Sequence, residues 1–253
     1  MKALWNSFKA AFAMYSRIPL KNIDWEKDNL KYMMVFFPFV GAMIGGISFG
    51  VWNLMRYVLD YSELLMAAVM VLIPVVITGG IHLDGLLDTA DAMSSYRERE
   101  KRIEILKDSH SGAFAIICAC AYFMVYYAAL TQIVLNRRKV IIFCFMYFMS
   151  RCISGFCVIS LPKINREGTV AKFSDKADKK IVRVLLILFL FAAYGLLLRT
   201  HLVMSGITTA TSLIVYLIFR RMALKNFGGV NGDLCGYFVC TCEAACALVL
   251  AFL

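Results

Sequence analysis

Three aspartates that could hold a cation recur along one short segment, because Asp84, Asp88 and Asp91 are separated by four and three residues. On a helix these spacings place all three carboxylates within about 60° of arc on one face. Grouped carboxylates repel each other, and Mg²⁺ takes carboxylate oxygens while keeping waters and substrate phosphates. The spacing therefore favours a metal–phosphate site. The alternative, a solvated helix start, accounts for Asp84 but poorly for Asp88 and Asp91, which lie further from the positive end of the dipole.

The residues beside the aspartates bear on how such a site is built. Gly79-Gly80 lets the chain turn where an apolar segment ends, and Gly85 leaves room for a ligand to approach the backbone. His82 lies some 160° from Asp84 on an ideal helix, so it joins the site only if the glycine pair breaks the helix. A role as a base and a role as a satisfied boundary histidine are equally supported.

Three further ionisable residues interrupt apolar segments. Asp233 opens the last apolar segment, Glu243 falls near its middle, and Arg151 falls within an earlier one. An ionisable residue inside a membrane is a functional candidate by default. A buried Arg151–Glu243 ion pair and contact of either residue with substrate remain equally supported.

The elements that must position these residues are membrane helices. The chain of 253 residues is 61% hydrophobic with a mean hydropathy of +0.72, more apolar surface than a soluble core of this length can hide. Spanning helices need roughly 20 apolar residues each. We therefore predict an all-α, polytopic transmembrane bundle that forms one domain over residues 1–253. Its seven spans lie at about 33–55, 63–80, 112–135, 140–161, 181–198, 202–219 and 234–253.

The first residues predict an interfacial helix in contact with membrane lipid. Apolar side chains recur there at helical spacing, with Lys2 and Lys9 on the polar side: Leu4, Trp5, Phe8, Ala11, Phe12 and Tyr15. A secretory signal peptide is the weaker alternative, because Lys9 interrupts any apolar core and no cleavage site precedes Pro19.

The net charge of +10 is distributed unevenly between the two ends of the predicted bundle. Most Lys and Arg residues fall before the first span and in the segments at about 81–111, 162–180 and 220–233. This asymmetry follows the positive-inside rule, so it places these segments in the cytoplasm and requires no nucleic-acid partner. The nine cysteines lie in or beside apolar spans, which predicts packing residues without a thiolate metal site or a disulfide framework.

The segment Gly79-Gly80-Ile81-His82-Leu83-Asp84-Gly85-Leu86-Leu87-Asp88-Thr89-Ala90-Asp91-Ala92 resembles the signature G-G-x-H-L-D-G-L-x-D-T-x-D-G/A of the cobalamin synthase family (adenosylcobinamide-GDP ribazoletransferase). Arg97, Arg99, residues 104–109 and Gly112 resemble the next block of that family. Weaker similarity covers residues 16–19, 150–151, 166–168 and 232–236. Cys240 departs from the family, which often carries a glutamate at this position as well as at Glu243, and residues 235–237 replace its usual small residues.

The resemblance implies transfer of α-ribazole or its 5′-phosphate onto adenosylcobinamide-GDP, with release of GMP and formation of adenosylcobalamin or its 5′-phosphate. It implies a Mg²⁺ cofactor and a late step of cobalamin biosynthesis at the prokaryotic inner membrane, with the site facing the cytoplasm. Asp84 and Asp88 are then expected as metal ligands, Asp91 as ligand or base, Asp108 as a further ligand, and His82 as the spare base. The expected substrate contacts are Arg97, Arg99, Lys107, Ser109, Arg151, Asp233 and Glu243.

Two other functions are compatible with parts of the sequence. A CDP-alcohol phosphotransferase also uses Asp-rich motifs and Mg²⁺, but Leu86-Leu87-Asp88 replaces the x-x-A-R portion of its motif. A secondary transporter predicts deep ionisable residues in two similar halves, and no such repeat is visible. The sequence leaves open self-association and association with other enzymes of cobamide assembly.

Overall fold

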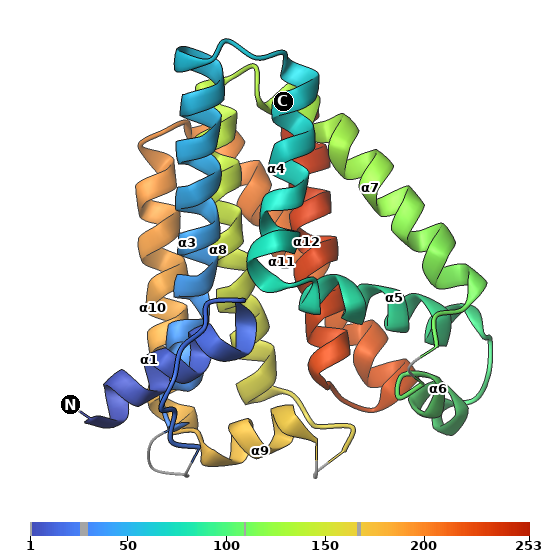
Figure 1. Cartoon of the computed structure of the whole chain (residues 1–253). Helices are drawn as coiled ribbons and strands as arrows, with labels where there is room; N and C mark the ends of the chain where they lie inside the picture. Colours follow the sequence, from blue (N-terminus) through green and yellow to red (C-terminus); the bar gives the residue numbers. More distant parts are fainter. Residues whose placement is uncertain (1, 26–29, 109, 166–167) are drawn as a thin grey trace.

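The computed structural model describes residues 2–25, 30–108, 110–165 and 168–253, and the secondary structure of these residues is helical apart from one isolated bridge between Lys163 and Val230 (Figure 1). The longer helices are α3 (Met33–Asn53, continued by the π-helical turn η1, Leu54–Val58), α7 (Ala113–Ile133), α8 (Arg137–Ser160), α10 (Lys179–Leu198), α11 (Leu202–Phe227) and α12 (Gly232–Phe252). The shorter helices are α1 (Lys2–Tyr15), α4 (Glu63–Thr78), α5 (Ile81–Ser94), α6 (Arg99–Ile105) and α9 (Thr169–Lys176).

The predicted polytopic helical bundle is confirmed. Among the described residues six helices are long and apolar enough to cross a membrane, and a seventh span results if α4 and α5 together count as one. The predicted span at 63–80 is the one that differs, because α4 has only 16 residues and meets α5 at a bend of 95°. The predicted loop at 220–233 also differs, because α11 remains helical up to Phe227.

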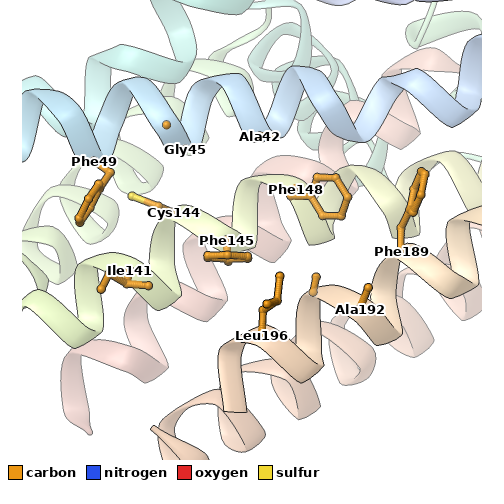
Figure 2. Close-up of a pocket in the computed structure, with 12 residues that line it drawn as sticks. Ala42, Gly45, Phe49, Ile141, Cys144, Phe145, Phe148, Phe189, Ala192 and Leu196 are labelled. Atoms are coloured by element: carbon orange, nitrogen blue, oxygen red, sulfur yellow. The ribbon is translucent and has the colours of Figure 1, made fainter. Parts of the chain in front are cut away.

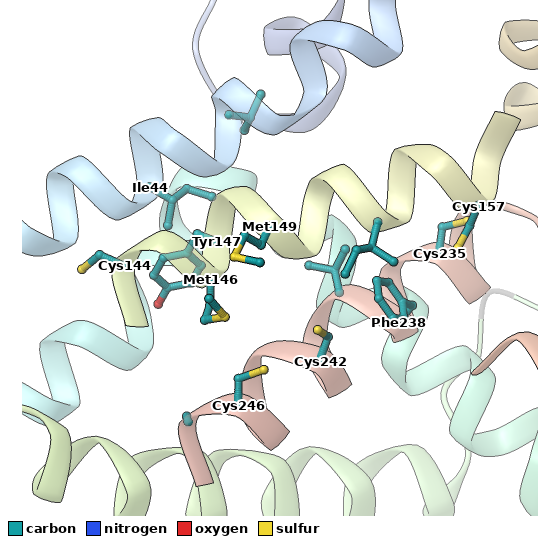
Figure 3. Close-up of a cluster of buried hydrophobic side chains, with 14 of the residues drawn as sticks. Ile44, Cys144, Met146, Tyr147, Met149, Cys157, Cys235, Phe238, Cys242 and Cys246 are labelled. Carbon is teal, nitrogen blue, oxygen red and sulfur yellow. The ribbon is translucent and has the colours of Figure 1, made fainter. Parts of the chain in front are cut away.

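The core of the bundle lies between α3, α8 and α12 (Figure 3). Gly41 and Gly45 face α8 one helical turn apart, and a Cβ atom at either position would overlap the backbone carbonyl of Tyr147 or Cys144. Small residues at this spacing let two membrane helices approach closely. Seven of the nine cysteines are buried, which agrees with their predicted role as packing residues.

Two consecutive glycines produce the bend between α4 and α5. Gly79 and Gly80 both have left-handed backbone conformations, with φ of 68° and 82°. Glycine adopts these angles without the steric penalty that a Cβ atom brings. As a result, α4 runs along the bundle while α5 turns across its end (Figure 1). The predicted role of this pair as a turn is confirmed.

One end of the bundle carries most of the short helices. Helices α1, α5, α6 and α9 all lie at the lower end in Figure 1, whereas the carboxyl terminus lies at the upper end. Lysine and arginine residues lie on α1, α6 and α9 and in the connections of this end, whereas α5 carries none. Exposed Leu4 and Trp5 on α1 agree with the interfacial helix predicted for this segment.

A groove on the side of the bundle is large but is lined by apolar side chains. It has a volume of about 590 Å³ and lies between α3, α8 and α10 (Figure 2). Its lining is apolar and includes a single thiol, that of Cys144, and four phenylalanines: Phe49, Phe145, Phe148 and Phe189. The candidate functional site must therefore lie elsewhere.

Candidate functional site

A second cavity lies at the end of the bundle that carries the short helices. It has a volume of about 460 Å³, and α1, α3, α5, α8, α9, α12 and nearby connections contribute to its wall. Its polar lining includes the predicted site residues His82, Asp84, Lys107 and Asp233, together with Ser154, Asn165 and Asn231. The cavity thus brings together residues from opposite ends of the sequence.

Close packing of α5 on α12 brings Asp84 and Asp233 to the same wall. A Cβ atom added at Gly85 would lie 2.7 Å from the Cα and 2.9 Å from the carbonyl carbon of Asp233. Gly236 makes the matching approach from α12, where an added Cβ would lie 3.0 Å from the carbonyl oxygen of His82. The predicted role of Gly85 in admitting a ligand is therefore wrong, since the space above its Cα is filled by the α12 backbone.

Replacing Gly85 with alanine should separate α5 from α12. The added methyl group has only backbone atoms as neighbours, and these cannot move aside as a flexible side chain can. We expect the free energy of unfolding to fall by about 1–3 kcal/mol, as for other overpacked positions, and turnover to fall with it. Thermal unfolding in detergent measures the first effect. Gly50→Ala is the matched control, because no heavy atom lies within 4 Å of its added Cβ. Equal stability of the two variants would contradict the packing role of Gly85.

The start of α12 fixes the Asp233 carboxylate. Asn231 is the N-cap residue, and its side-chain Oδ1 accepts a hydrogen bond of 3.0 Å from the backbone N–H of Leu234. The Nδ2 of the same side chain donates to Asp233 Oδ2 at 2.6 Å. An acid in the first turn is stabilised by the positive end of the helix dipole. The cap and the hydrogen bond from Asn231 together fix the position of the Asp233 side chain at the cavity wall.

The acidic cluster is not paired with a cation among the described residues. Asp84, Asp88 and Asp233 make no ion pair in the part of the chain that the structure describes. Partial burial and the charges of Asp84, Asp233 and Asp91 raise the pKa of Asp88 to about 6. A neighbouring cation would remove this repulsion.

The donor set fits a hard divalent cation in chemistry and charge. All three residues offer only oxygen atoms, which Mg²⁺ prefers, and two of the carboxylates line one cavity. Within the described residues no three Asp, Glu, His or Cys side chains gather around one point as a metal cluster. Asp84 and Asp233, the two carboxylates at the cavity wall, would hold such an ion, with its remaining positions left to water and substrate phosphates.

Asp91 has a different set of partners from the other two aspartates of its face. Its Oδ2 accepts from the backbone N–H of Gly112 at 2.5 Å, and its Oδ1 accepts from that of Ala115 at 2.8 Å. These N–H groups belong to the first turn of α7 and its cap, which otherwise lack partners. Asp91 thus ties α5 to the start of α7, and its predicted role as ligand or base stays a prediction.

His82 lines the cavity although it precedes Asp84 by only two residues. It is 7% exposed, and its ring packs near those of Tyr15 and Phe37. Nδ1 is enclosed without a hydrogen-bond partner, which leaves Nε2 as the ring nitrogen that can reach a ligand. Burial and, secondly, the charge of Arg151 lower the pKa of His82, so the ring is neutral at pH 7.

Of the basic residues Lys107, Arg97 and Arg99, which the sequence predicts to contact phosphate, one lines the cavity and two lie outside it. Lys107 lines the cavity. Arg97 is exposed and is not among the residues that line it. Arg99 packs over Gly228 and donates to the carbonyl oxygen of Lys225 at 3.3 Å, so it binds the carboxyl end of α11. Ser109 lies outside the described residues.

Asp108, predicted as a further metal ligand, faces a neighbouring histidine. Its Oδ1 lies 2.8 Å from Nδ1 of His110 and accepts from the His110 backbone N–H at 3.0 Å. These two contacts lower the pKa of Asp108, which is otherwise open to solvent. Asp108 is not among the described residues that line the cavity, so its metal role stays a prediction.

Arg151 and Glu243 form the buried ion pair that the sequence suggested. Nη1 of Arg151 lies 2.5 Å from Oε1 of Glu243, and the two side chains are 1% and 3% exposed. Ser150 donates to the same carboxylate oxygen at 2.8 Å, and Arg151 also donates to the Tyr147 carbonyl oxygen at 2.9 Å. The pair joins α8 to α12 in the interior. Neither residue lines the described cavity, so contact with substrate remains a prediction.

Sequence reasoning missed several residues of the cavity wall. Tyr15 and Met14 reach it from α1, Phe37 from α3 and Phe173 from α9. Tyr15 was recognised only as part of an apolar stripe, and nothing about Phe37 distinguishes it from its apolar neighbours. Asn231 had a local signal, since an Asn two residues before an acid and an apolar segment is typical of a helix N-cap.

The helical bundle and the acid-lined cavity together define a polytopic membrane protein with a polar site where its spanning helices meet the short helices at one end. Comparison with known proteins then identifies its family. A family model described as cobalamin-5-phosphate synthase matches residues 7–251. The chain belongs to the cobalamin-5-phosphate synthase family, as the segment at residues 79–92 predicted, and it is an enzyme of the transferase class.

Curated relatives extend over nearly the whole chain. A Lachnoclostridium phytofermentans protein named adenosylcobinamide-GDP ribazoletransferase is 38% identical over 248 residues, which cover 97% of this chain and 94% of that protein. A protein of the same name from Clostridium botulinum strain Alaska E43 is 32% identical, covering 94% and 93%. No solved structure matches the chain. The family assignment sets aside the phosphotransferase and transporter alternatives.

Proposed function

We propose that this protein transfers α-ribazole or α-ribazole 5′-phosphate onto adenosylcobinamide-GDP, with release of GMP, in a Mg²⁺-dependent reaction. The observation that carries the proposal is the cavity in which Asp84 and Asp233 meet beside His82 and Lys107. The names of the relatives supply the two substrates, adenosylcobinamide-GDP and ribazole. The products are adenosylcobalamin or its 5′-phosphate.

The reaction exchanges a phosphoanhydride bond of the donor for a phosphate ester bond. A hydroxyl oxygen of ribazole forms a bond to the phosphorus next to cobinamide, and the bond from that phosphorus to the GMP oxygen breaks. When bound, Mg²⁺ would neutralise charge on the pyrophosphate and on the leaving GMP. Asp84 and Asp233 at the wall would hold the ion, with Asp88 beside Asp84 on α5, Lys107 would contact a phosphate, and Nε2 of His82 would take the hydroxyl proton.

The proposed location is the prokaryotic cytoplasmic membrane with the cavity facing the cytoplasm. Support comes from the lysine- and arginine-rich segments, which lie at the same end of the bundle as the cavity. Positively charged segments are retained on the cytoplasmic side. Both soluble substrates would then reach the cavity from the compartment in which they are made.

The proposal predicts that the purified protein is inactive without a divalent cation. After chelation, protein reconstituted in liposomes should release no GMP from adenosylcobinamide-GDP and α-ribazole 5′-phosphate, and added Mg²⁺ should restore GMP and corrinoid product in equal amounts. Ca²⁺ at the same concentration is the control, because it accepts longer and more variable oxygen coordination than Mg²⁺. Full activity in the chelated protein would refute the metal requirement, and absence of product from folded, Mg²⁺-loaded protein would refute the reaction.

A further inference from the structure

One part of the cavity wall is not needed for the charge chemistry described above. Aromatic and apolar side chains from three helices form it: Met14 and Tyr15 of α1, Phe37 of α3, and Val170, Ala171 and Phe173 of α9. The rings of Tyr15 and Phe37 lie 4.2 Å apart between centroids, and Tyr15 and His82 lie 6.1 Å apart with an interplanar angle of 72°. Phe37 and Phe173 are almost fully buried, so these rings hold fixed positions.

The two halves of the wall suit the two halves of one small molecule. Charged and amide groups, including Asp84, Lys107 and Asp233, occupy one part, and the rings occupy the other. A ligand that matches both parts carries a phosphate or hydroxyl-rich end and a flat, weakly polar end. A flat heteroaromatic ring gains stacking energy against aromatic side chains whatever its substituents.

The volume of the cavity limits which parts of the two substrates of the proposed reaction can enter it. The cavity of about 460 Å³ lies within the range of roughly 300–1,000 Å³ that is typical of pockets for small ligands. It is of a size for a single nucleotide, whereas a corrinoid ring with its side chains is several times larger and must remain outside. The part of either substrate that enters is therefore a ribose with its base.

The low polarity of the ring-lined part favours the base of ribazole over the guanine of adenosylcobinamide-GDP. Guanine presents a hydrogen-bonding edge of several donors and acceptors, and burying such groups without partners is costly. Met14, Phe37, Val170, Ala171 and Phe173 on the ring-lined part offer no such partner, and Tyr15 offers a single hydroxyl, fewer than the edge of guanine requires. A benzimidazole presents carbon atoms along most of its edge and suits this lining.

We infer that the cavity is the acceptor site, and that the aromatic base of the ribazole substrate stacks on Tyr15 while its ribose lies toward Asp84 and His82. This inference rests on the proposed function. It makes Tyr15 a residue that determines affinity for ribazole, the acceptor, and it leaves the corrinoid ring and the guanine of the donor outside the ring-lined part. Helix α1 then has a role in recognition as well as in membrane contact.

The test compares Tyr15→Leu, which keeps most of the volume but removes the ring, with Tyr15→Phe, which keeps the ring. With donor saturating, Tyr15→Leu should raise the KM for α-ribazole 5′-phosphate by about tenfold or more, in line with the loss of one stacked base, and Tyr15→Phe should recover most of the affinity. The KM for adenosylcobinamide-GDP should change less than twofold. Tyr61→Ala, at an exposed tyrosine between α3 and α4, is the matched control.

Direct binding keeps this inference separate from the proposed reaction. Calorimetric titration with α-ribazole 5′-phosphate alone should give binding to the native protein and the same tenfold loss in Tyr15→Leu, with or without turnover. An unchanged acceptor affinity in both Tyr15→Leu and Phe173→Leu would overturn the inference, and Phe173→Leu supplies the test if Tyr15→Leu does not fold. A rise in the KM for the donor instead would show that guanine occupies the wall, which would also overturn it. Absence of product from the native protein, by contrast, is a failure of the proposed function.

Discussion

Replacing Asp84 with asparagine is expected to lower turnover by about 10²- to 10³-fold, because the site loses a carboxylate that would hold the Mg²⁺, and loss of one preorganised electrostatic contact has an effect of this size. The change removes an anion from the cavity wall and keeps the size of the side chain. Asp84 is exposed and makes no ion pair with any described residue, so the fold should not depend on it. Initial rates of GMP release measure the effect, and thermal unfolding confirms that the variant is folded.

The matched control for this prediction is Asp60→Asn. Asp60 is also an exposed aspartate, but it lies in the connection between η1 and α4, and its φ of 49° is one that asparagine also adopts readily. Its turnover should stay within about twofold of the native rate, as for surface changes away from a site. If Asp84→Asn were as active as this control, the proposed metal site would be wrong while the family and the fold would stand.

Replacing Arg151 with methionine is expected to lower the free energy of unfolding by about 3–5 kcal/mol, the cost of leaving one member of a buried ion pair without its partner. Glu243 would keep its hydrogen bond from Ser150 but lose the guanidinium at 2.5 Å. Unfolding of the detergent-solubilised protein by a denaturing detergent measures the loss. A loss under about 1 kcal/mol would contradict the structural role of the pair, because it would match a solvent-exposed pair.

The double variant Arg151→Met with Glu243→Leu distinguishes structure from substrate binding. Replacing both charges with apolar residues should recover much of the stability, because no buried charge is then left unpaired. Recovery of turnover together with stability would assign the pair to holding α8 against α12. Recovery of stability with turnover still lost would assign it a contact with substrate, as the sequence resemblance implies.

The sequence was sufficient for the bundle because its signals were long and local. Apolar stretches predicted the spanning helices, and Gly79-Gly80 predicted the turn before α5 because only glycine adopts two left-handed conformations in succession at little cost. The extent of α11 beyond residue 219 was missed, since Arg220, Arg221 and Lys225 ended the apolar stretch without ending the helix. Polar residues end a membrane span, but they do not by themselves end a helix.

The site was less predictable because it depends on contacts between distant helices. Asp84 and Asp88 were identified from their spacing, but the approach of Asp233 requires the packing of Gly85 against α12, which no local pattern reports. Asp91 shares the periodicity of Asp84 and Asp88, yet its hydrogen bonds go to the start of α7. Tyr15 and Phe37 are ordinary apolar positions until the fold places them beside His82.

The most direct test of the central claim is a count of bound Mn²⁺, used as a spectroscopic substitute for Mg²⁺, in the native protein and in Asp84→Asn and Asp233→Asn. Electron paramagnetic resonance of protein in lipid nanodiscs measures free and bound Mn²⁺ without any need for turnover. We predict that the native protein binds Mn²⁺ and that each variant loses affinity by at least tenfold, because residues from α5 and α12 hold the same ion. Unchanged binding in both variants would contradict the account and would place any metal site away from the cavity between these two helices.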